Sequence, residues 1–126
     1  MNEAIQLLHL ELNRMGRFEK CVTEKLVDFI NFLLTANQST NLTSITDFQD
    51  ALFKHIYDSL IIENRAEFQQ AESIIDIGSG AGIPAIPLAI SQPNKQFTML
   101  EATQKKVNFQ RNAAQHLNLK NTTSLW

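Results

Sequence analysis

The ten residues from Ile75 to Pro84, IDIGSGAGIP, restrict the possible folds of this chain more than any other stretch. Apolar residues lead into three glycines at alternate positions, Gly78, Gly80 and Gly82. Glycines with this spacing either adopt positive φ angles or allow a ligand to pack directly on the main chain. A helix over about residues 84–90 would point its free N–H groups at the same place. The stretch therefore predicts a strand, a tight turn and a helix that together hold a nucleotide.

The spacing of the glycines indicates which nucleotide. The dinucleotide fingerprint G-x-G-x-x-G would place its third glycine at position 83, where this chain has Ile83. The observed pattern is D-x-G-x-G-x-G, with Asp76 two residues before Gly78, and it resembles motif I of the S-adenosylmethionine-dependent methyltransferases. Glu101 ends a second apolar run, where a carboxylate can accept hydrogen bonds from both ribose hydroxyls. The alternative is a tight turn followed by an ordinary exposed glutamate.

Composition sets wider limits. A chain of 126 residues with 44% hydrophobic and 19% charged residues is long and apolar enough for a globular domain with a core. It has no apolar run of about 18 residues and no signal-peptide pattern, so no membrane association is expected. Cys21 is the single cysteine and cannot form an internal disulfide; its place in a helical stripe predicts a buried thiol. A reducing cytosol fits this cysteine usage.

Charge is distributed unevenly along the chain. Residues 1–101 contain seven basic and thirteen acidic side chains, whereas residues 102–126 contain four basic and no acidic ones. The basic residues of the C-terminal part are Lys105, Lys106, Arg111 and Lys120. Such a local basic face can contact phosphate, although a solvated helix surface would have the same composition.

The hydrophobic periodicity divides the chain in two. Residues 3–15 and 18–36 have the apolar spacing of amphipathic helices, the first ended by Gly16. A polar connection follows, and Asp47 can cap a third helix. From residue 73 the pattern alternates between strands, at 73–77, 96–100 and from 122, and helices, at 84–90 and 103–117. We therefore expect a helical segment over residues 1–70 and the first half of a Rossmann-like α/β domain over residues 71–126.

The apolar stripe of the third helix is interrupted by His55 and Ser59, and Asp58 lies three residues after the histidine. One interpretation is a core histidine that bonds to a backbone carbonyl or to Asp58. The other is a polar patch that faces the ligand cleft. A metal site is not expected, because one histidine and one aspartate are too few ligands.

Several segments together resemble one known family. In chain order these segments are Asn41 to Ile45 (NLTSI), His55 to Leu60 (HIYDSL), Asp76 to Leu88 (DIGSGAGIPAIPL), Glu101, Lys105 with Lys106, and Phe109. They are similar to the glucose-inhibited division protein B family, also called RsmG. These are bacterial enzymes that methylate N7 of a guanine in 16S ribosomal RNA of the small subunit. The family usually has an acidic residue followed by serine where this chain has Glu101 and Ala102.

The resemblance implies a class I methyltransferase fold, truncated here after the start of its third strand, with S-adenosylmethionine as cofactor and a cytoplasmic location. It implies cofactor-binding roles for residues of the turn and the second strand: Asp76, Gly78, Gly80, Gly82, Ile83 and Glu101. A substrate-facing surface would include Asn41, Thr43, His55, Asp58, Lys105 and Lys106. Guanine N7 carries a lone pair and no proton, so no catalytic acid or base is expected among residues 1–126.

Two expectations concern the length of the chain. Because the resemblance covers only the N-terminal part of the family, 126 residues should not form an active enzyme. The first strand would keep an unpaired edge, through which the fragment could self-associate. A non-catalytic fragment that binds cofactor or RNA, and half of a nicotinamide-dinucleotide oxidoreductase, are the alternative functions.

Overall fold

A computed structural model of the chain describes residues 3–14, 16 and 20–126. Its centre is a parallel sheet of strands β1 (Ser73–Ile77), β2 (Gln96–Leu100) and β3 (Thr122–Leu125), in that order across the sheet. Ser73 is opposite Gln96, and Phe97 is opposite Thr122. The predicted bounds of the first two strands are confirmed. Parallel strands require crossover helices, and α6 and α7 provide them.

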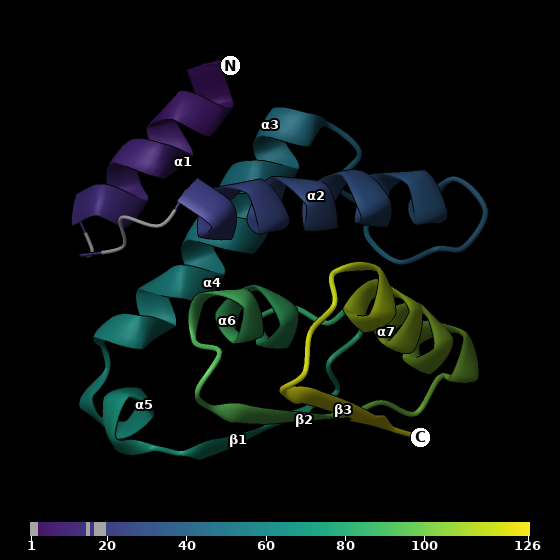
Figure 1. The fold of residues 1–126 in the computed structure, drawn as a ribbon. Helices are drawn as coiled ribbons and strands as arrows, with labels where there is room; N and C mark the ends of the chain where they lie inside the picture. The colour runs from purple at the N-terminus through teal and green to yellow at the C-terminus, as the bar shows by residue number, and fades with distance from the viewer. Residues whose placement is uncertain (1–2, 15, 17–19) are drawn as a thin grey trace.

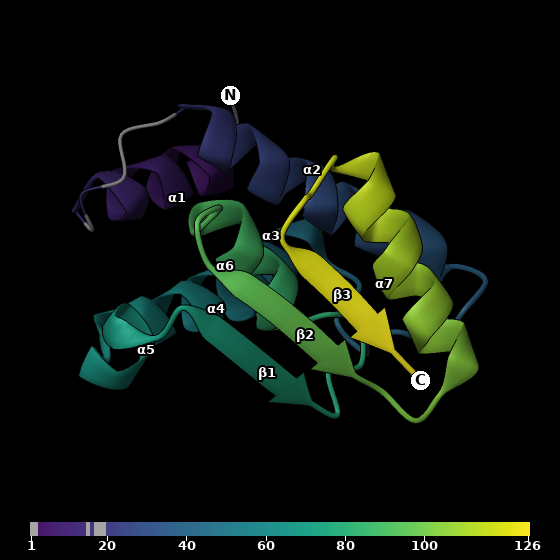
Figure 2. The ribbon, with the colours of Figure 1, turned by 60° about the horizontal axis from the view of Figure 1, so that its bottom comes forward.

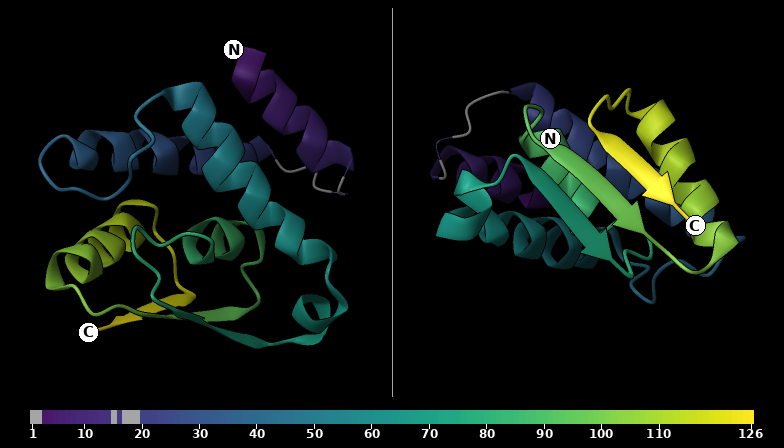
Figure 3. Two further views of the ribbon diagram at one scale, coloured as in Figure 1. Left: turned by 180° about the vertical axis from the view of Figure 1, so that it is seen from behind. Right: turned by 90° about the horizontal axis from the view of Figure 1, so that it is seen from below.

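The helices lie in layers on one face of this sheet (Figure 1, Figure 3). Helices α6 (Ala85–Ser91) and α7 (Gln104–His116) pack on the strands, and α2 (Lys20–Asn37) crosses over both. Helix α1 (Glu3–Arg14) and the helical segment 48–64 pack against α2, and the end of that segment also contacts α6. The short helix α5 (Ala66–Gln70), which the sequence pattern did not predict, lies beside the start of β1 (Figure 1). No helix in the described ranges is long and apolar enough to cross a membrane.

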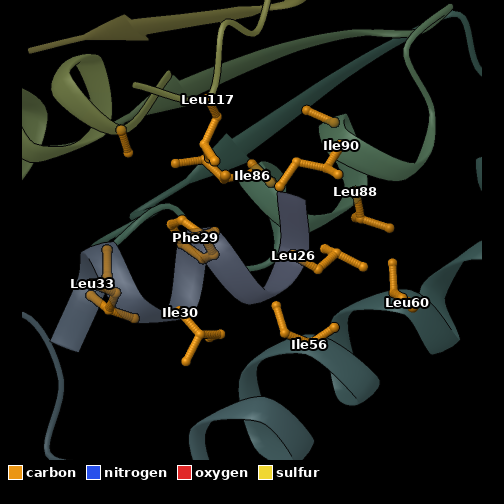
Figure 4. Close-up of a cluster of buried hydrophobic side chains, with 14 of the residues drawn as sticks. Leu26, Phe29, Ile30, Leu33, Ile56, Leu60, Ile86, Leu88, Ile90 and Leu117 are labelled. Atoms are coloured by element: carbon orange, nitrogen blue, oxygen red, sulfur yellow. The ribbon is translucent and has the colours of Figure 1, made fainter. Parts of the chain in front are cut away.

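One hydrophobic core joins the helical segment to the α/β part. Figure 4 shows Leu26, Phe29 and Ile30 of α2 between Ile56 and Leu60 on one side and Ile86 of α6 on the other. Phe29, Ile30, Ile56 and Ile86 have no exposed surface. The side chains of α2 pack both against the helical segment 48–64 and against the helices that lie on the sheet. Burial of its apolar stripe therefore holds the helical segment to α6 and α7.

The third helix differs from the single α-helix predicted for it. Asp47 caps it as expected, its carboxylate accepting from the N–H of Asp50 at 3.0 Å. The helix then runs as α3 (Phe48–Ala51), a π-helical stretch (Leu52–Tyr57), α4 (Asp58–Ile61) and a 3₁₀ turn (Ile62–Asn64). A π-helical stretch widens the turn and rotates the side chains that follow it. The apolar stripe is nevertheless buried within and after the π-helical stretch, at Leu52, Ile56 and Leu60.

The prediction of a buried Cys21 is wrong, since its side chain is exposed. Thr23, two residues further along the helix, is buried, and its hydroxyl lies 3.3 Å from Nδ1 of His9 on α1. The apolar stripe itself is buried at Leu26, Ile30 and Leu33. Successive helix residues are about 100° apart around the axis, and this rotation places Cys21 outside that stripe, where its thiol faces solvent. Two other residues assigned to these apolar stripes, Met15 and Phe18, lie outside the described residues.

The face of the sheet opposite α6 and α7 carries no helix in the described part of the chain (Figure 1). The side chains of Ile75 and Ile77 on β1 are 63% and 80% exposed, and that of Leu125 on β3 is 46% exposed. Among the described strands, β1 pairs only with β2, so its other edge has no strand partner. An apolar sheet face with a free edge favours contact with further polypeptide.

Candidate cofactor site

The glycine turn lies at the carboxyl end of β1, beside the carboxyl end of β2 (Figure 2). The N–H groups of Gly78 and Ser79 donate to the carbonyl of Leu100 at 2.8 and 3.2 Å. Those of Gly82 and Ile83 donate to the carbonyl of Ser79 at 2.8 and 3.3 Å. The turn is therefore folded on itself and held to the end of the neighbouring strand.

Glu101 adds a third connection. Its Oε1 accepts from the N–H of Gly80 at 2.8 Å, and its Oε2 accepts from the N–H of Thr103 at 2.8 Å. Partial desolvation raises the pKa of Glu101, but these hydrogen bonds from Thr103 and Gly80, with the positive charge of Lys106, outweigh it, and the pKa lies below its ordinary value. Glu101 is thus an ionised carboxylate that orients the glycine turn, and each of its oxygens retains a lone pair for a ligand hydroxyl.

The backbone of this site offers little to a phosphate. The N–H groups of residues 78, 79, 80, 82 and 83 all bond within the protein. At the start of α6, Ile86 donates to the carbonyl of Gly82, and Ala85 donates to the carboxylate of Asp76. The expectation that this helix points free N–H groups at the ligand is therefore wrong for these two residues. A site with two carboxylates and few free N–H groups favours a ligand without phosphate.

Asp76 is the second carboxylate of the site. Burial raises its pKa, and the hydrogen bond from the N–H of Ala85 partly opposes that effect. Its Oδ2 is buried and has no hydrogen-bond partner within the described structure. A buried carboxylate oxygen without a donor is costly, and a cationic or N–H donor of a ligand would satisfy it.

The three glycines serve two purposes. All have positive φ, +74° at Gly78, +56° at Gly80 and +83° at Gly82, a conformation that residues with a Cβ adopt with strain. A Cβ built on Gly78 or Gly80 would meet no atom within 4 Å, so both border open space. A Cβ on Gly82 would come within 2.9 Å of Cγ1 of Ile86. The first two glycines leave room where a ligand could lie, and the third is required for packing against α6.

Two of the predicted substrate-facing residues, His55 and Thr43, contact each other. Nε2 of His55 lies 2.9 Å from the hydroxyl of Thr43, which also accepts from the N–H of Ile45. Burial lowers the pKa of His55, and the carboxylate of Asp58 partly opposes that effect. Ser59 is buried, and its hydroxyl donates to the carbonyl of His55 at 2.5 Å. His55 is half-buried and fixes the connection after α2, whereas Asp58 is exposed, so neither alternative predicted for the histidine describes it fully.

A groove lies beside Lys105. It has a volume of about 420 Å³ and lies between the end of α2, the connection that follows it and the first turns of α7. Its lining residues are Phe32, Ala36, Ser39, Thr40, Leu42, Lys105, Asn108, Phe109 and Asn112. Asn41 and Thr43 line a shallower hollow next to it, which shares Leu42. Lys106 is half-buried and interacts with Glu101 instead. No group of three or more possible metal ligands occurs among the described residues.

Comparisons with known proteins agree with the geometry. The family model described as rRNA small subunit methyltransferase G matches residues 22–126. The chain belongs to this family. The relative from Haemophilus influenzae (strain PittEE) is 43% identical over 100 residues, 79% of this chain. The relative from Clostridium botulinum (strain Alaska E43) is 41% identical over 125 residues, 99% of this chain, and that from Aster yellows witches'-broom phytoplasma is 39% identical over 105 residues, 83% of it. All three carry the name "Ribosomal RNA small subunit methyltransferase G".

The chain spans about half the length of these relatives, 48% of the first and 50% of the other two. The three parallel strands with helices on one face are consistent with a partial Rossmann-like methyltransferase fold. Sequence reasoning missed two residues of the site, Ser79 and Gln110, both buried beside the glycine turn. The one available signal was a glutamine at an inward-facing position of the helix over 103–117.

Proposed function

We propose that this chain is the cofactor-binding half of a bacterial methyltransferase that transfers a methyl group from S-adenosylmethionine to N7 of a guanine in 16S ribosomal RNA. Membership of the family supports an RNA methyltransferase, and the resemblance of residues 41–45 and 55–60 to it supports the guanine N7 target. The proposed setting is the small ribosomal subunit in the cytoplasm.

One observation carries the choice of cofactor: two carboxylates, Asp76 and Glu101, border a glycine turn in which the N–H groups of residues 78, 79, 80, 82 and 83 are already bonded. S-adenosylmethionine has a positively charged sulfur, an ammonium group, a ribose and no phosphate. Asp76 would receive the ammonium, directly or through water, and Glu101 would accept from the ribose hydroxyls while it holds the turn. Gly78 and Gly80 would lie against the methionine part, and Ile83 would pack beside it. The ribose of a dinucleotide could also bond to Glu101, but its pyrophosphate would find the carboxylate of Asp76 and few free N–H donors at the turn.

The reaction itself requires little of the residues in this half. S-adenosylmethionine supplies a methyl group on sulfur that a lone pair can attack directly. Because guanine N7 has no proton to lose, no side chain needs to act as a general base. The chain's contribution is to hold the cofactor in a single orientation, which is catalysis by positioning.

The RNA would approach the face that carries the groove. Lys105 lines that groove with Asn108 and Asn112. Asn41 and Thr43 line the hollow next to it, and we assign His55, which contacts Thr43, and Asp58 to the same substrate-facing surface. We assign Lys106 to the same surface, and its positive charge also helps to lower the pKa of Glu101. We also propose that the free edge and open face of β1 lead the isolated 126-residue chain to self-associate, and that this chain alone transfers no methyl group.

A thermal-shift comparison of S-adenosylhomocysteine with the oxidised nicotinamide dinucleotide tests the cofactor. Stabilisation by S-adenosylhomocysteine alone is expected; stabilisation by the dinucleotide alone would reject the proposal.

A chimera tests the activity. The chain would be fused to the C-terminal half of the Clostridium botulinum relative, to which it is 41% identical. Incubated with labelled S-adenosylmethionine and unmethylated small subunits, the chimera should label guanine N7, and the 126-residue chain should not. If a well-folded chimera binds cofactor and RNA but labels nothing, the remaining function is a non-catalytic cofactor- or RNA-binding fragment.

A further inference from the structure

Gln110 on α7 reaches the glycine turn from the side opposite Glu101. Its side chain is completely buried, and its Nε2 donates to the hydroxyl of Ser79 and to the carbonyl of Gly80, both at 2.7 Å. A glutamine amide has two N–H donors, so both are used on this one turn. Ser79 is 31 residues away in the sequence and is itself 2% exposed.

Burial of this amide needs an explanation. A buried polar side chain is unfavourable unless all of its groups find partners. The Oε1 of Gln110 is buried without a hydrogen-bond partner in the described part of the chain. Its neighbours on the inner face of α7, Val107 and Ala113, are apolar and fully buried. An apolar side chain would fit this position without a stranded oxygen, so the core itself does not require glutamine.

The glycine turn does require such contacts. Gly80 has φ +56°, and a Cβ built on it would meet no atom within 4 Å, so no packing fixes its backbone. Glycine has more backbone conformations available than any other residue. Glu101 holds the N–H of Gly80 and Gln110 holds its carbonyl, so two side chains from β2 and α7 select one conformation of this residue.

We propose that Gln110 is a positioning residue that holds the glycine turn ready for its ligand. Ser79 transmits this restraint, because its hydroxyl accepts from Gln110 and its own carbonyl accepts the N–H groups of Gly82 and Ile83. The turn is thus organised before the ligand arrives, and the ligand does not have to order it. That the ligand is S-adenosylmethionine rests on the proposed function above; the restraint on the turn does not.

Amide hydrogen exchange on the ¹⁵N-labelled chain tests the restraint without any ligand. Gln110→Met keeps the length of the side chain and removes both donors. Gln115→Leu, at an exposed position of the same helix, is the matched control. Loss of two hydrogen bonds of ordinary strength corresponds to about a 30-fold change in an equilibrium constant. We expect exchange at Gly80 and Gly82 to rise by about that factor in Gln110→Met, with exchange at Met99 on β2 unchanged and no effect of the control.

Unchanged amide exchange at Gly80 and Gly82 in a folded Gln110→Met variant would overturn the proposal. An equal rise in exchange at Gly80, Gly82 and Met99 would overturn it too, because it would show a general loss of stability. If Gln110→Met does not fold, Ser79→Ala removes the acceptor at the other end. It should raise exchange at Gly80 and Gly82, and the absence of that effect would overturn the proposal equally. The affinity for S-adenosylhomocysteine should fall up to about 30-fold in Gln110→Met. If the unmodified chain does not bind this ligand, the proposed function fails while the exchange result still decides the role of Gln110.

Discussion

Alanine substitutions at Gly78 and Gly82 should have different effects, although the sequence presents the two glycines as equivalent members of one motif. Both have φ near +80°, where a residue with a Cβ is strained by about 1–2 kcal/mol. At Gly78 the added Cβ meets nothing within 4 Å, so strain is the whole cost to folding. Gly78→Ala should lower the free energy of unfolding by about 1–2 kcal/mol.

At Gly82 the Cβ would also collide with Ile86, whose side chain is completely buried and has little room to move. Overpacking of a core typically costs about 1–3 kcal/mol. Added to the backbone strain, this makes Gly82→Ala destabilising by about 2–5 kcal/mol. Binding should respond in the opposite order, because the Cβ of Gly78→Ala projects into the open space proposed for the cofactor, whereas that of Gly82→Ala points into the core.

Urea unfolding, followed by circular dichroism, gives the two free energies, and calorimetry with S-adenosylhomocysteine gives the two affinities. The truncation Ile86→Val, made together with Gly82→Ala, is a useful control because it removes a methyl group from the side chain that collides. The double variant should recover part of the stability lost in Gly82→Ala. Equal destabilisation by the two alanine substitutions, within about 0.5 kcal/mol, would refute the assignment of separate roles.

Three further variants test other contacts of the site. Asp76→Asn should leave the free energy of unfolding at neutral pH unchanged or higher, because it removes a carboxylate whose pKa is raised by burial. The same variant should no longer bind the cofactor, and normal binding would exclude Asp76 from the site. Burial lowers the pKa of His55 below its ordinary 6.5, so the folded state disfavours its protonation, and stability present above pH 6.5 should be lost as the pH falls below that value. His55→Gln should flatten this part of the melting-temperature profile, and an unchanged profile would assign the pH dependence to other groups. Lys105→Gln in the chimera should weaken RNA binding and reduce the slope of log affinity against log salt by about 1. The control is Lys25→Gln, at an exposed position of α2. Equal slopes for the two variants would remove Lys105 from the RNA surface.

Local chemistry was sufficient for the elements of the α/β part. The strands over 73–77 and 96–100 are short apolar runs bounded by turn residues, and such runs have few alternatives once the helices between them are recognised. The positive φ angles at Gly78, Gly80 and Gly82 also follow from residue type, because only glycine adopts them without strain. The family followed from the spacing of a few short segments, and the match over residues 22–126 confirms it.

In the helical segment the apolar spacing predicted the buried faces of the helices, but two details were missed. Apolar spacing located α2 but placed Cys21 in the core, and it did not reveal the π-helical stretch Leu52–Tyr57. Cys21 lies outside the buried stripe, and residue type alone does not show on which side of that limit a small thiol falls. A π-helical stretch differs from an α-helix in its backbone hydrogen bonds, and the apolar spacing does not report these.

Residue types and their spacing are enough to predict a glycine turn at the end of a parallel strand, with acidic residues at the ends of two strands. The contacts of those groups depend on the folded structure. It pairs Glu101 with Gly80, Gln110 with Ser79, and His55 with Thr43, contacts separated by 21, 31 and 12 residues. It also bonds the N–H groups of residues 78, 79, 80, 82 and 83 within the protein, which leaves few backbone donors for a phosphate. The physical reason is that hydrogen bonds between distant side chains depend on angles and distances of a few tenths of an ångström, and these are fixed only when the core between α2, α6 and α7 has packed.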